Sequence, residues 1–437
     1  MSIEYGTLLI VVLMVGLMII GLPLAFVTAF TAGVFGFILF GADSFFLIVS
    51  RIYTLMNNYA LISVPLFVLM GCILERSGLV EGMFRSLHLL VGRVPGGLAV
   101  ATIAASTIMA AMVGVIGAEI VTLGLVCLPA MLRRGYDKRL VSGVICAGGS
   151  LGTMIPPSVV LIVYGLVAQV SIGKLFMAAI GPGLLLGGLY AAYAVAICWR
   201  RPELAPPPPA SEFEVPLGQR LKEMRALIAP ALLIGFVMIC FYTGIATPTE
   251  VGALGTLGAL VILAVNGQFT LPNLRHSVVQ TGRTVAMVTW IFFGASALVG
   301  IYTLAGGTSF LHGEILDLGF GPLGTVLLMM AILVILGCFL DWIGIALLTM
   351  PIFVPIIKGL GYDPVWFGIL FCMNMQISYL SPPFGPAAFY LKGVAPPEVS
   401  LADIFAGVWP FILLQALAIT LVIAFPDIAL WLPAHTQ

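Results

Sequence analysis

The sequence has 437 residues, of which 61% are hydrophobic and 8% are charged, and its mean hydropathy is +1.18. This composition excludes a soluble globular domain and is typical of a polytopic α-helical membrane protein. Eighteen basic and 18 acidic residues give a net charge of zero, which excludes the basic surface expected of a nucleic-acid-binding protein. The seven cysteines lie in apolar runs and match no metal-binding or disulfide spacing. The N-terminus lacks a basic leader, so no cleaved signal peptide is expected.

Apolar runs in the first half predict membrane-spanning helices, because a span needs about 20 apolar residues. The expected spans are residues 7–20, 22–40, 59–74 and 176–199. The segment 43–57 is amphipathic and is expected to lie in the membrane interface. The segment 75–95 carries five charges and is expected to be interfacial or aqueous. Two longer apolar stretches, 96–132 and 140–168, are interrupted in the middle by small or helix-breaking residues.

A polar segment at 200–225 separates the two halves of the chain and includes four consecutive prolines. It carries too many charges to enter a bilayer, so it is expected to be a cytoplasmic linker. The second half, 226–437, then repeats the order of the first half, 1–199. Its spans are expected at 226–242, 251–265, 284–304 and 405–431, its interfacial segment at 268–280, and its interrupted stretches at 321–357 and 364–392.

A shift of 226 positions relates the two halves. It places Pro156 and Pro157 on Pro382 and Pro383, and Tyr164 on Tyr390. Eight of the 36 positions from 129 to 164 are identical without a gap. Proline and glycine at these places prevent a continuous helix. The sequence therefore predicts a duplicated membrane domain with one broken helix in each half.

The stretches 96–132 and 321–357 fit either two full spans or a re-entrant hairpin that enters and leaves on one side. Their central interruptions are neither long enough nor charged enough for aqueous turns, which favours hairpins. Each half then has five crossings, and the halves are inverted. With the linker in the cytoplasm, 15 of the 18 Lys and Arg residues lie inside, as the positive-inside rule requires. Charge fixes this orientation but does not separate hairpins from paired spans, because the flanking loops stay on the same sides.

Inverted repeats with broken helices are the architecture of secondary transporters. Carbonyl groups freed at a break can hold a cation, and helix N-termini can face an anion. Glu119 and Asp341 lie in apolar runs, where a carboxylate is costly and by default functional. The alternatives are an interhelical hydrogen bond for Glu119 and a helix cap for Asp341. No HExxH or GxSxG motif indicates an intramembrane enzyme, and broken helices favour alternating access over a channel.

The run LPAMLRRGYD, followed by AGGSLGTMIPPS and YG, is the most specific part of the sequence. Together with PLFVLMG at 65–71 and the segment from Asp341 to Pro355, it resembles the large membrane subunit (DctM type) of tripartite ATP-independent periplasmic (TRAP) transporters. The resemblance covers nearly the whole chain. It implies an all-α polytopic membrane protein, an inverted-repeat elevator-type transporter with about ten transmembrane helices, two re-entrant hairpins and two broken helices.

The resemblance also implies ligand sites. The hairpin tips at 113–119 and 340–345 would face the breaks at 148–158 and 374–385, with a Na⁺ site at each contact and substrate between them. The residues expected to hold Na⁺ are Gly114, Glu119, Ser150, Thr153, Asp341, Gly344, Ser378 and Ser381. Those expected to bind substrate are Pro157, Ser158, Tyr164, Gln376, Pro383 and Gly385. Tyr164, like Tyr390, also fits an interfacial anchor.

One departure from the family concerns the first hairpin tip. Many members carry Ser-Gly-Ser-Ser there, whereas this chain has Val113, Gly114, Val115 and Ile116. Without those hydroxyl groups, the first cation site would depend on carbonyl groups, on Ser150 or Thr153, or on Glu119.

The function that the resemblance implies is Na⁺-coupled import of an organic anion, such as a dicarboxylate, across the bacterial inner membrane. The expected partners are a small TRAP membrane subunit, a periplasmic substrate-binding protein and membrane lipid. Hairpins and broken helices would move as one domain against a scaffold near 7–40 and 226–265. The alternative is a stand-alone ion-coupled anion symporter of the same architecture, which co-purification of a small membrane protein would exclude.

Overall fold

The computed structural model describes residues 2–92, 94–114, 116–207, 217–383 and 385–435. Helices are the only regular secondary structure in these ranges. Within these ranges, six helices are long and apolar enough to cross a membrane, or up to seven if one bent pair forms a single span. Further apolar helices of 10–17 residues include both arms of the first hairpin. The expectation of an all-α polytopic membrane protein is therefore confirmed.

The first helices of the chain follow the predicted segments closely. Helices α1 (Ile3–Ile19) and α2 (Leu24–Phe40) are separated at Gly21–Pro23, and α3 (Asp43–Met56) is the predicted amphipathic segment. The 3-10 helix η1 (Tyr59–Ile62) leads into α4 (Ser63–Glu75), which is bent by 61° from α3. The bend begins at Asn57, and the side chain of Asn58 accepts a hydrogen bond from the Ala60 amide at 3.1 Å. Helix α5 (Leu79–Val91) follows in the charged segment.

The first interrupted stretches form a pair of packed helices and a broken helix. Helices α6 (Gly97–Val113) and α7 (Ile116–Leu132) contact each other. Helix α8 (Lys138–Ser150) and the 3-10 helix η2 (Leu151–Thr153) end at the proline pair, and α9 (Val159–Ala168) resumes beyond it. Asp137 caps α8 by accepting hydrogen bonds from the amides of Arg139 and Leu140. Helix α10 (Ile172–Arg200) and η3 (Pro202–Leu204) close this half.

The second half of the chain follows the linker. It contains α11 (Leu217–Thr243), α12 (Pro248–Val265), α13 (Leu271–Leu304), α14 (Gly307–Asp317), α15 (Gly321–Gly337), α16 (Trp342–Gly359), α17 (Pro364–Leu380), α18 (Pro386–Val394), α19 (Leu401–Ala424) and α20 (Asp427–Ala434). Helix α17 begins at a proline in its first turn, where no amide donor is needed, and Asp363 caps it. The breaks thus fall where the sequence placed them, at Pro156–Pro157 and Pro382–Pro383, and both of these peptide bonds are cis.

The largest differences from the expected segments are in the second half of the chain. Residues 268–280 are not a separate interfacial segment, because α13 runs unbroken through 34 residues with its only proline in the first turn. Helix α11 begins at Leu217, inside the expected linker, whose residues 208–216 lie outside the described ranges. The last apolar segment is divided at Pro426 into α19 and α20, and α14 was not anticipated.

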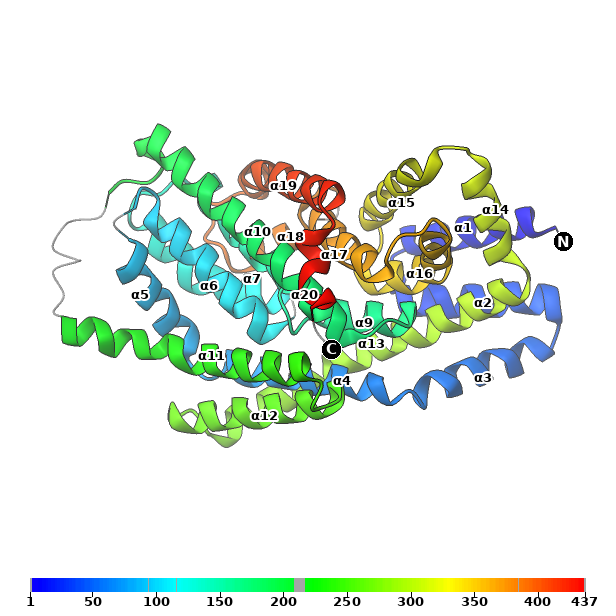
Figure 1. The fold of residues 1–437 in the computed structure, drawn as a ribbon, viewed down its shortest axis with the longest axis horizontal. Helices are drawn as coiled ribbons and strands as arrows, with labels where there is room; N and C mark the ends of the chain where they lie inside the picture. The colour runs from blue at the N-terminus through cyan, green and yellow to red at the C-terminus, as the bar shows by residue number, and fades with distance from the viewer. Residues whose placement is uncertain (1, 93, 115, 208–216, 384, 436–437) are drawn as a thin grey trace.

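Most of the helices pack as two groups, which meet along α13 and α4. One group joins α1–α4, α12 and α13 through contacts of α13 with α2, α3 and α4 and of α12 with α4. The other holds both hairpins and both broken helices, with α10 and α17–α20 lying between the two hairpins (Figure 1). Within this group, the helix that follows each break packs against the hairpin of the other half: α9 packs against α16, and α18 packs against α7. Each broken helix therefore contacts the hairpin of the other half.

Candidate functional site

A cavity of about 550 Å³ lies between the hairpin group and helix α13. Gly114 lines it from the tip of the first hairpin, and Asp341 lines it from the tip of the second. Val159, at the start of α9, and Tyr390, on α18, bring both broken helices to the same space. The cavity is therefore the place where the two halves of the chain converge.

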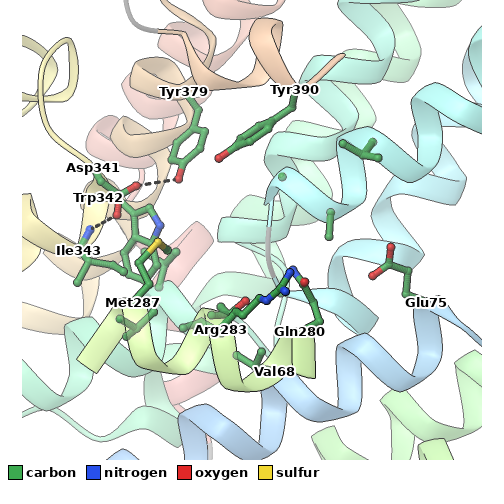
Figure 2. Close-up of a pocket in the computed structure, with 18 of the residues that line it drawn as sticks. Val68, Glu75, Gln280, Arg283, Met287, Asp341, Trp342, Ile343, Tyr379 and Tyr390 are labelled. Carbon is green, nitrogen blue, oxygen red and sulfur yellow. Dashed lines mark hydrogen bonds between the residues drawn. The ribbon is translucent and has the colours of Figure 1, made fainter. Parts of the chain in front are cut away.

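The α13 wall of the cavity carries a polar stripe. His276, Gln280, Arg283 and Met287 all line the cavity. Their spacing of four, three and four residues places them on one face of the helix. Glu75, at the end of α4, lines the cavity beside them. Figure 2 shows Arg283 and Gln280 projecting from α13 toward the space beneath the two tyrosines of the opposite wall.

On the opposite wall, Asp341 accepts hydrogen bonds from two different elements. Its carboxylate accepts a hydrogen bond from the Tyr379 hydroxyl at 3.1 Å and one from the Ile343 amide at 3.3 Å (Figure 2). The second bond makes Asp341 the N-cap of α16. Tyr379 lies at the end of α17, so this pair joins the tip of the second hairpin to the second broken helix.

A second, much smaller space lies behind Asp341. It measures about 10 Å³ and is lined by Asp341 and Ser378 together with Gly337 and Ile345. That volume suits a single water or a monatomic ion. The carboxylate of Asp341 and the hydroxyl of Ser378 are oxygen ligands of the kind that hard cations prefer. Ser378 also donates a hydrogen bond to the Asn374 carbonyl oxygen at 3.3 Å.

The first contact between hairpin tip and break is built differently. A Cβ atom at Gly114 would lie 3.1 Å from the carbonyl oxygen of Pro157, so the tip touches the break directly. Glu119 is fully buried, and neither of its carboxylate oxygens has a hydrogen-bond partner among the described residues. A Cβ atom at Gly152 would lie 2.7 Å from one of those oxygens. Val115 lies outside the described residues, as do the side chains of Val113 and Ile116.

The hydroxyl groups expected at this first contact are hydrogen-bonded to backbone carbonyl groups. Ser150 donates to Ala147 at 2.7 Å, and Thr153 donates to Ser150 at 3.0 Å. Ser158 donates to Thr153 at 2.7 Å. All three side chains are fully buried. Their oxygen atoms lie within the break, but none of the three residues lines the large cavity.

The remaining expected residues are scattered around the second break and the buried core. Tyr164 is fully buried, and its hydroxyl donates to the carbonyl oxygen of Pro364. Gln376 is buried, and its amide has no hydrogen-bond partner among the described residues. Ser381 donates to Ile377, and Gly344 packs against Leu24. Pro157, Pro383 and Gly385 belong to the breaks and, like the residues above, do not line the large cavity.

Sequence reasoning missed the polar stripe of α13. Gln280, Arg283 and His276 lie on the cavity wall, yet 268–280 was expected to be an interfacial segment and Arg283 a marker of orientation. The signal was present, because the polar residues at 276, 280 and 283 recur at the spacing of one helix face. Tyr390, which fitted an interfacial anchor, also lines the cavity.

Comparison with known proteins identifies the family. The family described as "Tripartite ATP-independent periplasmic transporter, DctM component" matches residues 11–428. The chain belongs to the DctM family. It is 31% identical to the C4-dicarboxylate TRAP transporter large permease protein DctM of Pseudomonas aeruginosa, covering 92% of both chains. It is 30% identical to the sialic acid TRAP transporter large permease protein SiaM of Vibrio cholerae, covering 96% of both.

A solved structure supports the fold of this DctM-family permease. The YdaH transporter of Alcanivorax borkumensis matches with a TM-score of 0.64 and 16% sequence identity, covering 94% of this chain and 98% of that one. The resemblance inferred from the proline breaks is thereby confirmed at the level of the family. The protein is a large permease subunit of a TRAP transporter and is not an enzyme. Its cavity is accordingly interpreted as part of a transport pathway.

Proposed function

We propose that this DctM-family permease imports an organic carboxylate, delivered by a periplasmic binding protein, in a Na⁺-coupled cycle. The observation that carries this proposal is the cavity in which both hairpin tips meet both broken helices and α13. Two of its relatives are named for C4-dicarboxylate and sialic acid, which are both organic acids. The cavity of about 550 Å³ has the size of a small-molecule site.

Na⁺ would bind where each hairpin tip meets a break. At the second contact, Asp341 and Ser378 would supply oxygen ligands around the small space behind the tip. At the first contact, the Glu119 carboxylate and the carbonyl groups near Ser150 and Thr153 are the oxygen atoms available. When bound, Na⁺ would neutralise the buried carboxylate and hold the tip against the break. Ion and substrate would then favour each other's binding.

The hairpin group would move as one body against the group that contains α13. The cavity between part of α13 and the hairpin tips would leave room for this movement. In the orientation favoured by the charges, the wall with Arg283 and His276 would lie toward the cytoplasm, and this arrangement would be open to the inside. The membrane would be the bacterial inner membrane, and the remaining partner would be a small TRAP membrane subunit.

Uptake into proteoliposomes tests this proposal. The permease would be reconstituted with its small subunit and supplied with binding protein loaded with radiolabelled succinate or N-acetylneuraminate. We expect accumulation when a Na⁺ gradient is imposed, and none when K⁺ replaces Na⁺. Uptake without the binding protein would support the stand-alone symporter instead. Uptake that needs ATP, or that ignores the Na⁺ gradient, would refute the proposed coupling.

A further inference from the structure

The charged groups that line the large cavity are not equivalent. Glu75 accepts a hydrogen bond from Thr122 at 3.2 Å, and His276 is hydrogen-bonded to Arg76. Asp341 is held by Tyr379 and by the Ile343 amide. Each of these groups therefore has a protein partner.

Arg283 is different, because no hydrogen bond or ion pair joins it to any residue that the structure describes. Its side chain is exposed and projects from α13 into the cavity (Figure 2). The guanidinium group thus has its full set of donors free for a ligand.

The surroundings of Arg283 limit what that ligand can be. Gln280, one turn earlier on the same face, offers an amide that also has no partner among the described residues. Tyr390 presents a phenol from the opposite wall, on the other group of helices (Figure 2). A guanidinium beside an amide and a phenol can bind a carboxylate in a bidentate manner, with further hydrogen bonds to neighbouring polar groups.

We propose that Arg283 is the residue that recognises the carboxylate of the substrate, acting from α13 while Tyr390 faces it from the hairpin group. This inference rests on the proposed function and adds to it the contact that selects an acid over a neutral compound. Because Arg283 and Tyr390 belong to different groups of helices, the substrate would be held between the two. Movement of one group past the other would then release the carboxylate from Arg283.

A competing explanation is that Arg283 only helps to orient the protein in the membrane, because it lies on the side where positive charge accumulates. Arg275 provides a matched control for that explanation. It lies on the same helix, two turns before Arg283, and it is also exposed, but it does not line the cavity. A purely topological role would be shared by the two arginines, whereas recognition of a carboxylate would belong to Arg283 alone.

Chemical labelling tests the proposal on the wild-type complex. Phenylglyoxal would be applied with and without succinate or N-acetylneuraminate, using succinamide as the neutral control, and modified arginines would be located by mass spectrometry. We expect Arg283 to be modified and to be protected by at least one acid but not by succinamide, with Arg275 unprotected. An unmodified Arg283, or an Arg283 that no acid protects, would overturn the inference.

Substitution provides a second test, in the proteoliposome assay with saturating loaded binding protein. We expect R283Q to lower the rate of acid uptake about ten- to a hundredfold, as loss of a charge-assisted contact does. R283K should recover part of the rate, and R275Q should stay within about twofold of wild type. Equal losses in R283Q and R275Q, or normal uptake by R283Q, would overturn the inference. If wild type takes up neither acid, the proposed function fails, and labelling still decides whether Arg283 binds a carboxylate.

Discussion

The hydroxyl group of Tyr164 donates a 2.7 Å hydrogen bond to the backbone carbonyl oxygen of Pro364. Tyr164 belongs to α9, beyond the first break, and Pro364 is the first residue of α17. The Tyr164 ring also stacks on Phe371, with ring centroids 5.9 Å apart. These contacts tie the two broken helices together in the buried core. They give Tyr164 a structural role at a distance from the cavity.

Removal of this hydroxyl should destabilise the protein. Y164F would lose one buried hydrogen bond, which is worth about 1 kcal/mol, so its apparent melting temperature in detergent should fall. Y390F is the control, because the Tyr390 hydroxyl has no hydrogen-bond partner among the described residues. Its melting temperature should equal that of wild type. A Y164F protein as stable as Y390F would show that the bond to Pro364 contributes nothing.

Neutralising Asp341 should weaken the response to Na⁺ while leaving the fold intact. Asparagine caps helices about as well as aspartate, so D341N should keep the start of α16 in place. Loss of the charge near a bound cation should raise the Na⁺ concentration for half-maximal uptake at least about tenfold. Asp363 caps α17 in the same way but does not line the large cavity or the small space behind Asp341. D363N should therefore leave the Na⁺ dependence unchanged, and an equal effect in both variants would argue against a site at Asp341.

A methyl group at position 152 should compete with Glu119 for space. We expect G152A to lower stability by about 1–3 kcal/mol, because its Cβ atom would lie 2.7 Å from a carboxylate oxygen. Shortening the acid should relieve the clash, so G152A should cost less in an E119A background, as a double-mutant thermal denaturation series would report. G188A is the control, since a Cβ atom at Gly188 meets no atom within 4 Å. Identical costs of G152A in both backgrounds would disprove the contact.

Thr122 should stabilise the observed position of the hairpin group relative to α4, because its hydroxyl donates a hydrogen bond from the first hairpin to Glu75 of α4. T122V would remove a bond worth about 1 kcal/mol and should shift the population away from this arrangement severalfold. The measurement is the labelling rate of a cysteine placed at position 118, on the cavity wall, in a variant without the seven native cysteines. Labelling should be slower in T122V and unchanged in T122S, which keeps the hydroxyl. Equal rates in T122V and wild type would show that the two groups are not held by this bond.

Much of the fold could be predicted because a membrane helix requires a continuous apolar run, which is visible in the local sequence. The lengths of the apolar runs predicted most of the helices, and the proline pairs predicted the positions of both breaks. The continuous α13 was missed because its first turns are polar, and polarity alone does not separate an interfacial helix from the end of a long span. The division at Pro426 was missed because apolar runs lie on both sides of the Pro426–Asp427 pair.

The candidate site was only partly predictable, for a physical reason. The hairpin tips and breaks could be found from glycine, proline and isolated carboxylates within apolar runs. The wall they face comes from α13, which is remote in sequence from both breaks and whose orientation depends on packing against α2, α3 and α4. Arg283 could be counted as a charge, but its position opposite Tyr390 follows only from the tertiary arrangement.

The length of α13 has a consequence for the membrane around the protein. At about 1.5 Å per residue, its 34 residues extend about 51 Å, whereas the hydrocarbon layer is about 30 Å thick. Unless the helix is steeply tilted, some 20 Å of it must lie among lipid headgroups or in water. The end that carries Arg275 and His276 suits that environment. Bilayer thickness would then set the depth of this wall relative to the hairpins, so that lipids of different chain length would tune the rate of transport.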